Sequence, residues 1–309
     1  EISAKDLRAS DSGGASRISA TVGGHEIFFE SDDIELTAAP EVFASALLPA
    51  TVQHGSRLHI DQPLDRRWLR NVQGVIDVWT GWWGVAPRLG DHLRAPRWLV
   101  PRPRGRRAGG VGLCFSLGVD SFFSLVSAPR RFDTLILCEG FDIALGDRAR
   151  MDAATAAVRA VADAHGLDLV VLRTNLRQHR PVKGSGWGRT HGGALAALGH
   201  ACRGRLGELV ISSTYHVSQD GPWGSHWDTD HGWSSALLEV SHYGERYTRH
   251  EKVAAILGDP LAERHLRVCW ENRASAGNCG ECEKCCRTML QIQVLGGRLE
   301  DWPFAGSGS

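Results

Sequence analysis

The chain has 309 residues, of which 35 are basic and 35 acidic, and 42% of the residues are hydrophobic. A chain of this length can form one large domain or two, each with its own apolar core. The balanced charge excludes a strong overall field that would direct the chain to nucleic acids or membrane surfaces. No apolar run approaches the roughly 20 residues that cross a bilayer, and residues 1–24 do not resemble a signal peptide. We therefore expect a cytoplasmic protein.

Residues 1–107 are predicted to form an N-terminal α+β region of unknown role. A hairpin is expected at Gly23-Gly24, because strand-like segments over 17–22 and 26–30 flank this pair. Residues 1–95 carry 13 acidic but only nine basic side chains. This acidic balance argues against nucleic acid as a partner.

Two helices are predicted in the same region. The first begins at Pro40, since proline suits the first turn of a helix. The second follows a capping Asp65 and carries apolar side chains at helical spacing, from Trp68 to Trp79. A stretch rich in Pro, Gly and Arg over 101–107 then predicts a linker, more simply a solvated connector than a phosphate-binding segment.

From Val111 onward, strand-like and helix-like segments alternate. The predicted strands cover 111–115, 134–138, 169–172 and 209–213, and the predicted helices cover 151–165 and 190–202. This alternation predicts a doubly wound α/β fold with a parallel sheet. In such sheets ligands bind outside the carboxyl ends of the strands. We therefore expect the loops after these four strands to surround one cleft.

The segment from Ser116 to Ser121 follows the first of these strands and reads as a tight turn into a helix. Its sequence is Ser-Leu-Gly-Val-Asp-Ser, so Gly118 permits close backbone approach and the two serines supply hydroxyl groups. A helix N-terminus presents unpaired N–H groups and suits a phosphate. The spacing differs from the Walker pattern, which requires Lys and Ser or Thr after its last glycine. A serine-rich strand-to-helix turn without a ligand is the alternative.

Four cysteines near the C-terminus have the spacing of metal ligands. Cys279, Cys282 and Cys285 are separated by two residues each, and Cys269 lies ten residues upstream, at the end of a predicted strand over 266–268. Thiolates at this spacing suit a tetrahedral structural zinc site. An iron–sulfur cluster and unligated thiols remain alternatives. Cys286 is a spare thiol beside Cys285.

The loop and the cysteine tail together resemble the 7-cyano-7-deazaguanine synthase branch of the PP-loop ATP pyrophosphatase superfamily. The resemblance covers about residues 108–296, and it differs at Leu117, where the family has a glycine. A Thr-Arg-x-Glu segment that includes Arg249 stands where that branch has a Thr-Lys-x-Glu-like segment. The resemblance implies that residues 108–309 form an adenine nucleotide alpha hydrolase-like domain with a zinc-binding tail.

The resemblance also implies an activity. ATP would be cleaved between its α and β phosphates, and the adenylated carboxylate or amide of a small molecule would then react with a nitrogen nucleophile. Asp120 would hold Mg2+, and Arg249 would neutralise a phosphate; a second cationic candidate is Lys183. The ATP-binding residues would be Ser116, Leu117, Gly118, Val119, Asp120 and Ser121, with Cys138, Glu139 and Gly140 beside the adenine.

The loop over 213–234 is the predicted substrate-binding segment. It combines histidines and aspartates with Trp223, Trp227 and Trp233, a composition that suits a flat polar ring or a sugar. Asp228 and His231 are the candidate base and acid, alongside Ser121 among the catalytic candidates. The alternative is a surface loop stabilised by tryptophans.

The sequence thus predicts an ATP-dependent, AMP- and pyrophosphate-forming ligase that uses ATP, Mg2+ and Zn2+. Its partners would be a small-molecule substrate and an ammonia or sulfur donor, without nucleic acid or a membrane, and a homodimer is conceivable. One alternative is sulfur transfer after the same adenylation, for which Cys114 or Cys138 is the candidate thiol. The other is a nucleotide-binding module without catalysis, because the side chain of Leu117 would crowd a pyrophosphate.

Overall fold

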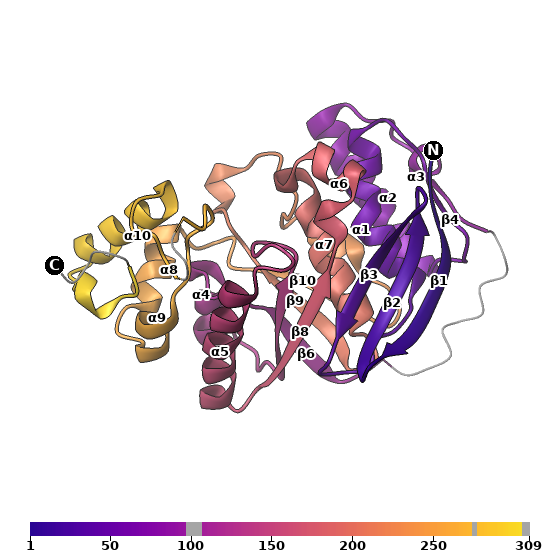
Figure 1. The fold of residues 1–309 in the computed structure, drawn as a ribbon. Helices are drawn as coiled ribbons and strands as arrows, with labels where there is room; N and C mark the ends of the chain where they lie inside the picture. The colour runs from indigo at the N-terminus through magenta and orange to yellow at the C-terminus, as the bar shows by residue number, and fades with distance from the viewer. Residues whose placement is uncertain (97–106, 274–276, 305–309) are drawn as a thin grey trace. The chain divides into compact units, whose positions relative to one another are not determined.

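The computed structural model describes residues 1–96, 107–273 and 277–304 (Figure 1). The linker predicted over 101–107 lies outside these ranges except for its last residue. The strands are β1 (Ile2–Ser12), β2 (Ala15–Val22), β3 (His25–Ser31), β4 (Leu58–Ile60), β5 (Leu93–Arg94), β6 (Gly110–Cys114), β7 (Thr134–Glu139), β8 (Asp168–Thr174), β9 (Leu206–Ser212) and β10 (Glu239–Tyr243). The helices are α1 (Pro40–Gln53), α2 (Arg66–Trp83), α3 (Leu89–His92), α4 (Val119–Ser127), α5 (Arg148–His165), α6 (Arg180–Ser185), α7 (Trp187–Ala201), α8 (Arg249–Ile256), α9 (Pro260–His265) and α10 (Glu283–Val294).

The described strands form a ten-stranded, mostly parallel sheet in the order β10-β9-β6-β7-β8-β3-β2-β1-β4-β5. The predicted α/β class is confirmed. The chain divides into two compact units, and each is built from three stretches of sequence. The first unit comprises Glu1–Gly112, Leu172–Ile211 and Gly221–His242, and the second comprises Leu113–Val171, Ser212–Asp220 and Tyr243–Ser309.

The predicted hairpin of the first unit is confirmed: β2 and β3 pair antiparallel, with Val22 opposite His25. The strand β1 lies beside β2 in the same antiparallel manner but was not predicted (Figure 1). Its side chains are mostly exposed and polar, so it lacks the alternating apolar pattern that indicates a strand. Backbone pairing with β2 and β4 therefore defines this strand.

The core of the first unit includes a close contact between α1 and α7. The helix α1 is buried on nearly all sides and begins at Pro40, as predicted. A Cβ atom at Gly193 of α7 would lie 2.3 Å from the carbonyl oxygen of Ser45. Glycine at this position therefore permits the two backbones to approach, which a larger residue would prevent. Beside this contact, the buried carboxylate of Glu41 lies 2.8 Å from the guanidinium of Arg203.

The fully buried His200 of α7 makes the stability of the first unit sensitive to pH. Its Nε2 donates a hydrogen bond to the carbonyl oxygen of Trp233 at 2.9 Å. Burial lowers the pKa of His200 to about 3. The unfolded chain takes up this proton near pH 6.5, so between these values protonation favours unfolding, and stability falls as the pH is lowered.

We expect the parent protein to lose about 2 kcal/mol more of its free energy of unfolding between pH 7 and pH 5 than a His200→Gln variant. Glutamine keeps an N–H donor for Trp233 but does not titrate. Urea unfolding of both proteins at the two pH values measures the difference. Equal losses in the two proteins would contradict this account.

In the second unit, capping residues mark the ends of α5 and the start of α8. Asp147 caps α5, and Gly166 ends this helix with a φ of +65°, as predicted. The side chain of Thr248 and that of Glu251 form a reciprocal capping box at the start of α8. Figure 1 shows α8, α9 and α10 grouped near the C-terminal end. Within the described ranges, no helix has both the length and the apolar character to cross a bilayer.

The predicted strand over 266–268 is wrong. This segment follows α9 but joins no strand of the sheet. The N–H group of Arg267 donates to the carbonyl oxygen of Leu117, and the next N–H groups donate to the side chain of Asn278. A short apolar run satisfies the pattern of a strand, but here its donors are already engaged by tertiary contacts.

Candidate functional site

The loop between β6 and α4 contains a left-handed turn at Leu117, where φ is +64°. This conformation is unfavourable for residues with a Cβ atom and is the one that glycine adopts readily. The Leu117 side chain is buried, with only 2% of its surface exposed, so it does not project into the solvent in front of the loop. The carbonyl oxygen of Leu117 accepts a hydrogen bond from Arg267 N at 2.8 Å.

The loop ends at Gly118, which is the N-cap of α4 and has an extended backbone. No side chain caps this helix, so its first N–H groups are available to an acceptor. Ser121 is buried, and its hydroxyl group donates to the carbonyl oxygen of Gly118 at 3.0 Å, while Val119 is buried in the core. Ser116 is exposed. Of the two predicted hydroxyl donors, only Ser116 therefore faces solvent.

Asp120, in the first turn of α4, is held between two cations of α8. Its carboxylate lies 3.3 Å from Lys252 Nζ and 3.6 Å from Arg249 Nη1. Lys252 Nζ also donates to the carbonyl oxygen of Ser213, which directly follows β9, at 2.5 Å. Two predicted site residues, Asp120 and Arg249, thus lie together. Lys252 was missed, because a lysine in an amphipathic helix is usually solvated and gives no signal of its own.

The two cations of this site are poorly hydrated. Only 1% of the Lys252 side chain and 16% of the Arg249 side chain are exposed. Burial lowers the pKa of Lys252 and that of Arg249, and Asp120 opposes both shifts. Arg249 also donates to the hydroxyl group of Thr288 on α10 at 3.1 Å. A partly exposed carboxylate beside one buried and one half-buried cation is an arrangement that can accept both a divalent ion and a polyphosphate.

The last residues of β7 and the turn that follows them are engaged in local hydrogen bonds. The thiol of Cys138 donates to the carbonyl oxygen of Glu139, and the buried Glu139 carboxylate accepts from Gly146 N at 3.0 Å. Gly140 has a φ of +98° and its N–H donates to the carbonyl oxygen of Ile143. The Glu139 side chain therefore organises the turn before α5. The backbone of this turn remains the predicted adenine-binding element.

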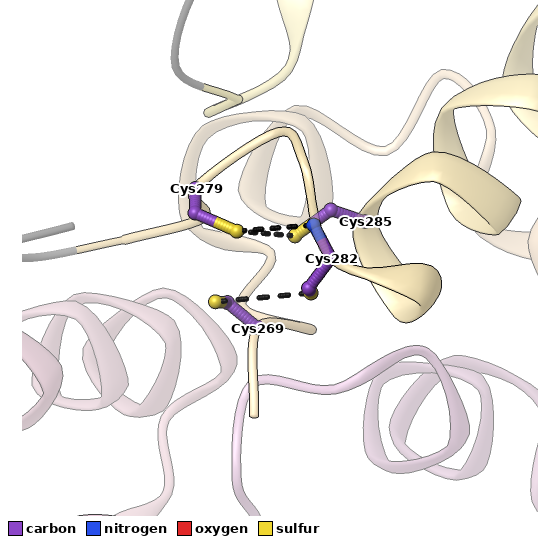
Figure 2. Close-up of side chains that lie close together, drawn as sticks. All are labelled: Cys269, Cys279, Cys282 and Cys285. Carbon is purple, nitrogen blue, oxygen red and sulfur yellow. Dashed lines mark hydrogen bonds between the residues drawn. The ribbon is translucent and has the colours of Figure 1, made fainter. Parts of the chain in front are cut away.

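The predicted metal ligands Cys269, Cys279, Cys282 and Cys285 lie together and are buried. Their sulfur atoms are all within 4.8 Å of one another and face a common centre (Figure 2). The sulfur atoms of Cys279 and Cys285 are 3.9 Å apart, and those of Cys282 and Cys269 are 4.0 Å apart. In a tetrahedron with Zn–S bonds of about 2.3 Å the sulfur atoms are about 3.8 Å apart. The residues therefore fit a four-coordinate zinc ion.

The thiol chemistry of this cysteine centre also favours a cation. Burial opposes ionisation of Cys269, but hydrogen bonds from its neighbours lower its pKa to about 7. Burial raises the pKa of Cys285. Four buried thiolates cannot coexist without compensation, so a divalent ion would supply the missing positive charge. Backbone N–H groups of Glu281 and Cys282 point at the sulfur of Cys279 and would stabilise the thiolate.

Three predicted site residues belong to the first unit, whereas the loop and the cysteine centre belong to the second. Lys183 is exposed on α6. The carboxylate of Asp228 is mostly exposed and lies 3.7 Å from His226 Nδ1, and the exposed His231 contacts the carbonyl oxygen of Trp227. These three residues therefore belong to a different unit from Asp120. The substrate loop itself divides between the units at Asp220.

Sequence reasoning placed Asp230 in this loop but missed its pairing with His242 of β10. Asp230 is fully buried and accepts hydrogen bonds from Ser225 Oγ at 2.6 Å and from His242 Nδ1 at 2.7 Å. Trp233, expected to line a substrate site, is fully buried against Trp68. The side chains of Asp230 and Trp233 are therefore buried in the first unit, where their contacts stabilise the fold.

Comparisons of this chain with family models, curated proteins and solved structures find no significant match.

Proposed function

We propose that the protein is an ATP-dependent, AMP- and pyrophosphate-forming ligase whose nucleotide site is the loop 116–121 in the second unit. The observation that carries the proposal is the placement of Asp120 between Lys252 and Arg249 at the open N-terminus of α4. The left-handed backbone at Leu117 supports it, because the turn has the conformation for which the resembled family uses glycine. In this proposal the sheet is doubly wound, as in adenine nucleotide alpha hydrolases.

Each part of the site would have a distinct role in ATP binding and cleavage. Free N–H groups of the loop and of the first turn of α4 would bind the pyrophosphate portion of ATP. Asp120 would hold Mg2+, which neutralises charge on the phosphate oxygens. Arg249 and Lys252 would stabilise the charge that develops on the leaving pyrophosphate. A carboxylate or amide oxygen of the substrate would attack the α-phosphate, and a nitrogen nucleophile would then displace AMP from the adenylated carbon.

The cysteine centre would have a structural role in this enzyme. All four ligand positions of a tetrahedral ion are filled by cysteine sulfur, so no position is open to a substrate. The zinc ion would supply charge compensation and hold the four thiolates together. Chemistry on the substrate is therefore assigned to the loop and to the cations of α8.

The proposal predicts a defined pair of products. Purified protein with ATP and Mg2+ is incubated with pools of small carboxylates, amides and nucleobases, together with ammonia or sulfide, and the products are resolved by phosphorus NMR. We expect AMP and pyrophosphate in equal amounts, dependent on one pool and on ammonia. ADP with phosphate would contradict the loop assignment. Dependence on sulfide alone would replace nitrogen addition by sulfur transfer, and nucleotide binding without products would favour a non-catalytic module.

A further inference from the structure

Asn278 connects the cysteine centre to the segment that supports the nucleotide loop. Only 2% of this residue is exposed. Its Oδ1 accepts hydrogen bonds from the N–H groups of Val268 at 2.7 Å and Cys269 at 3.1 Å. Its Nδ2 donates to the carbonyl oxygens of Leu266 at 2.7 Å and Pro303 at 3.0 Å. The amide therefore forms four hydrogen bonds, all to backbone atoms, which is its full capacity.

The segment 266–269 has contacts on two sides. On one side, Arg267 N donates to the carbonyl oxygen of Leu117 in the left-handed turn. On the other side, Asn278 engages the next two N–H groups, and Cys269 supplies a sulfur atom to the cysteine centre. The segment belongs to no strand of the sheet. Asn278 thus holds the backbone on both sides of Arg267, whose N–H group binds the carbonyl oxygen of Leu117. It also holds the backbone of Cys269.

A second connection runs through α10. This helix begins directly after Cys282 and carries Cys285. Its buried Thr288 accepts a hydrogen bond from Arg249, whose guanidinium also lies 3.6 Å from Asp120. The loop is therefore supported at Leu117 by the segment 266–269, which contains Cys269. Asp120 is supported by Arg249, which contacts α10, the helix that contains Cys285.

We propose that Asn278 is a positioning residue that couples the cysteine centre to the nucleotide loop, so that metal binding and nucleotide binding strengthen one another. A leucine does not favour a left-handed turn, so Leu117 needs support from its surroundings. The bond from Arg267 N provides that support only while the segment 266–269 is held in place. The statement that this coupling affects nucleotide binding rests on the proposed function. By thermodynamic linkage, each ligand must then raise the affinity of the protein for the other by the same factor.

The test compares Asn278→Ala with Asn175→Ala in the zinc-loaded full chain. Asn175 is a matched control, because it also bridges two backbone groups, Phe28 N and Glu26 O, but lies in the first unit. Zinc release to a chromogenic chelator is followed by absorbance. Residues that orient metal ligands typically contribute about 10- to 100-fold to metal affinity, and we expect this loss to appear as zinc release from Asn278→Ala about 10- to 100-fold faster than from the parent. Release from Asn175→Ala should stay within twofold of the parent.

Two further measurements distinguish a positioning role of Asn278 from a general loss of stability. Hydrogen exchange should show faster exchange of Arg267 and of the peptide over 113–121 in Asn278→Ala, and calorimetric titration should show weaker binding of ATP. An Asn278→Asp variant keeps the oxygen acceptor for Val268 and Cys269 and should release zinc at an intermediate rate. If Asn278→Ala does not fold, the same exchange comparison is made between zinc-loaded and chelator-stripped parent protein.

Zinc release from Asn278→Ala as slow as from Asn175→Ala would overturn the positioning role. Fast release with unchanged exchange over 113–121 would overturn the coupling to the loop. Failure of the parent to bind ATP would contradict the proposed function instead, and the release and exchange measurements would still decide the role of Asn278.

Discussion

A Cys285→Ser variant is expected to lose its zinc and to unfold at a markedly lower temperature than the parent. Cys285 is fully buried, and its sulfur atom lies 3.9 Å from that of Cys279. Binding of structural zinc is worth about 10–16 kcal/mol in zinc-finger peptides, and this free energy stabilises the folded state. Removal of one ligand should therefore reduce zinc affinity by more than the 10- to 100-fold typical of changes outside the ligand set.

Cys286→Ser provides the matched control for this prediction. Cys286 is the adjacent residue, but it is exposed, and its thiol contacts the carbonyl oxygens of Gly280 and Glu281 outside the cluster. We expect this variant to retain one zinc ion per chain and the melting temperature of the parent. Elemental analysis and thermal unfolding of both variants supply the measurements. Equal zinc contents in the two variants would rule out the four-cysteine assignment.

Replacing Asp120 by Asn is expected to reduce the rate of pyrophosphate release by at least about 10²- to 10³-fold, the size of effect found when one preorganised electrostatic group is removed. Asparagine preserves the shape of the side chain but removes the charge that would hold Mg2+. It also removes the counter-charge of the buried Lys252 and the half-buried Arg249. A coupled pyrophosphate assay at saturating ATP and substrate measures the loss.

The control for this variant is Asp259→Asn in the same unit. Asp259 caps α9 through its Oδ1, and asparagine caps helices about as well as aspartate does. We expect Asp259→Asn to retain the activity and stability of the parent. Full activity of Asp120→Asn, with both variants folded by circular dichroism, would remove Asp120 from the proposed mechanism.

Much of the fold could be predicted because it depends on local signals. Pro40, Asp65 and Gly166 each mark a helix boundary that the structure confirms, since these residues act through their own backbone or their nearest neighbours. The buried strand β7 was evident from a continuous apolar run. The four-cysteine cluster could be predicted from spacing, because cysteines separated by two residues can reach the same ion.

The parts that could not be predicted depend on contacts between distant residues. Nothing near Lys252 indicates that its amine is buried against Asp120, which is 132 residues away. Asp230 similarly meets His242 because β10 returns beside the loop, whereas the exposed Asp228 and His231 had the more suggestive sequence context. Pattern-based prediction cannot distinguish a polar side chain that faces solvent from one whose partner is supplied by another element.

The first unit is assembled from three separate stretches of the chain, which affects how it folds during synthesis. The buried Glu41 of α1 meets Arg203 across 162 residues of intervening sequence, and Gly193 of α7 meets Ser45. The ribosome therefore releases α1, an apolar helix, long before its packing partner exists. Contacts of such long range slow folding, because a large loop must close before they form. Until residue 201 has emerged, the apolar side chains of α1 lack their packing partner in α7, and such exposed apolar surface favours aggregation.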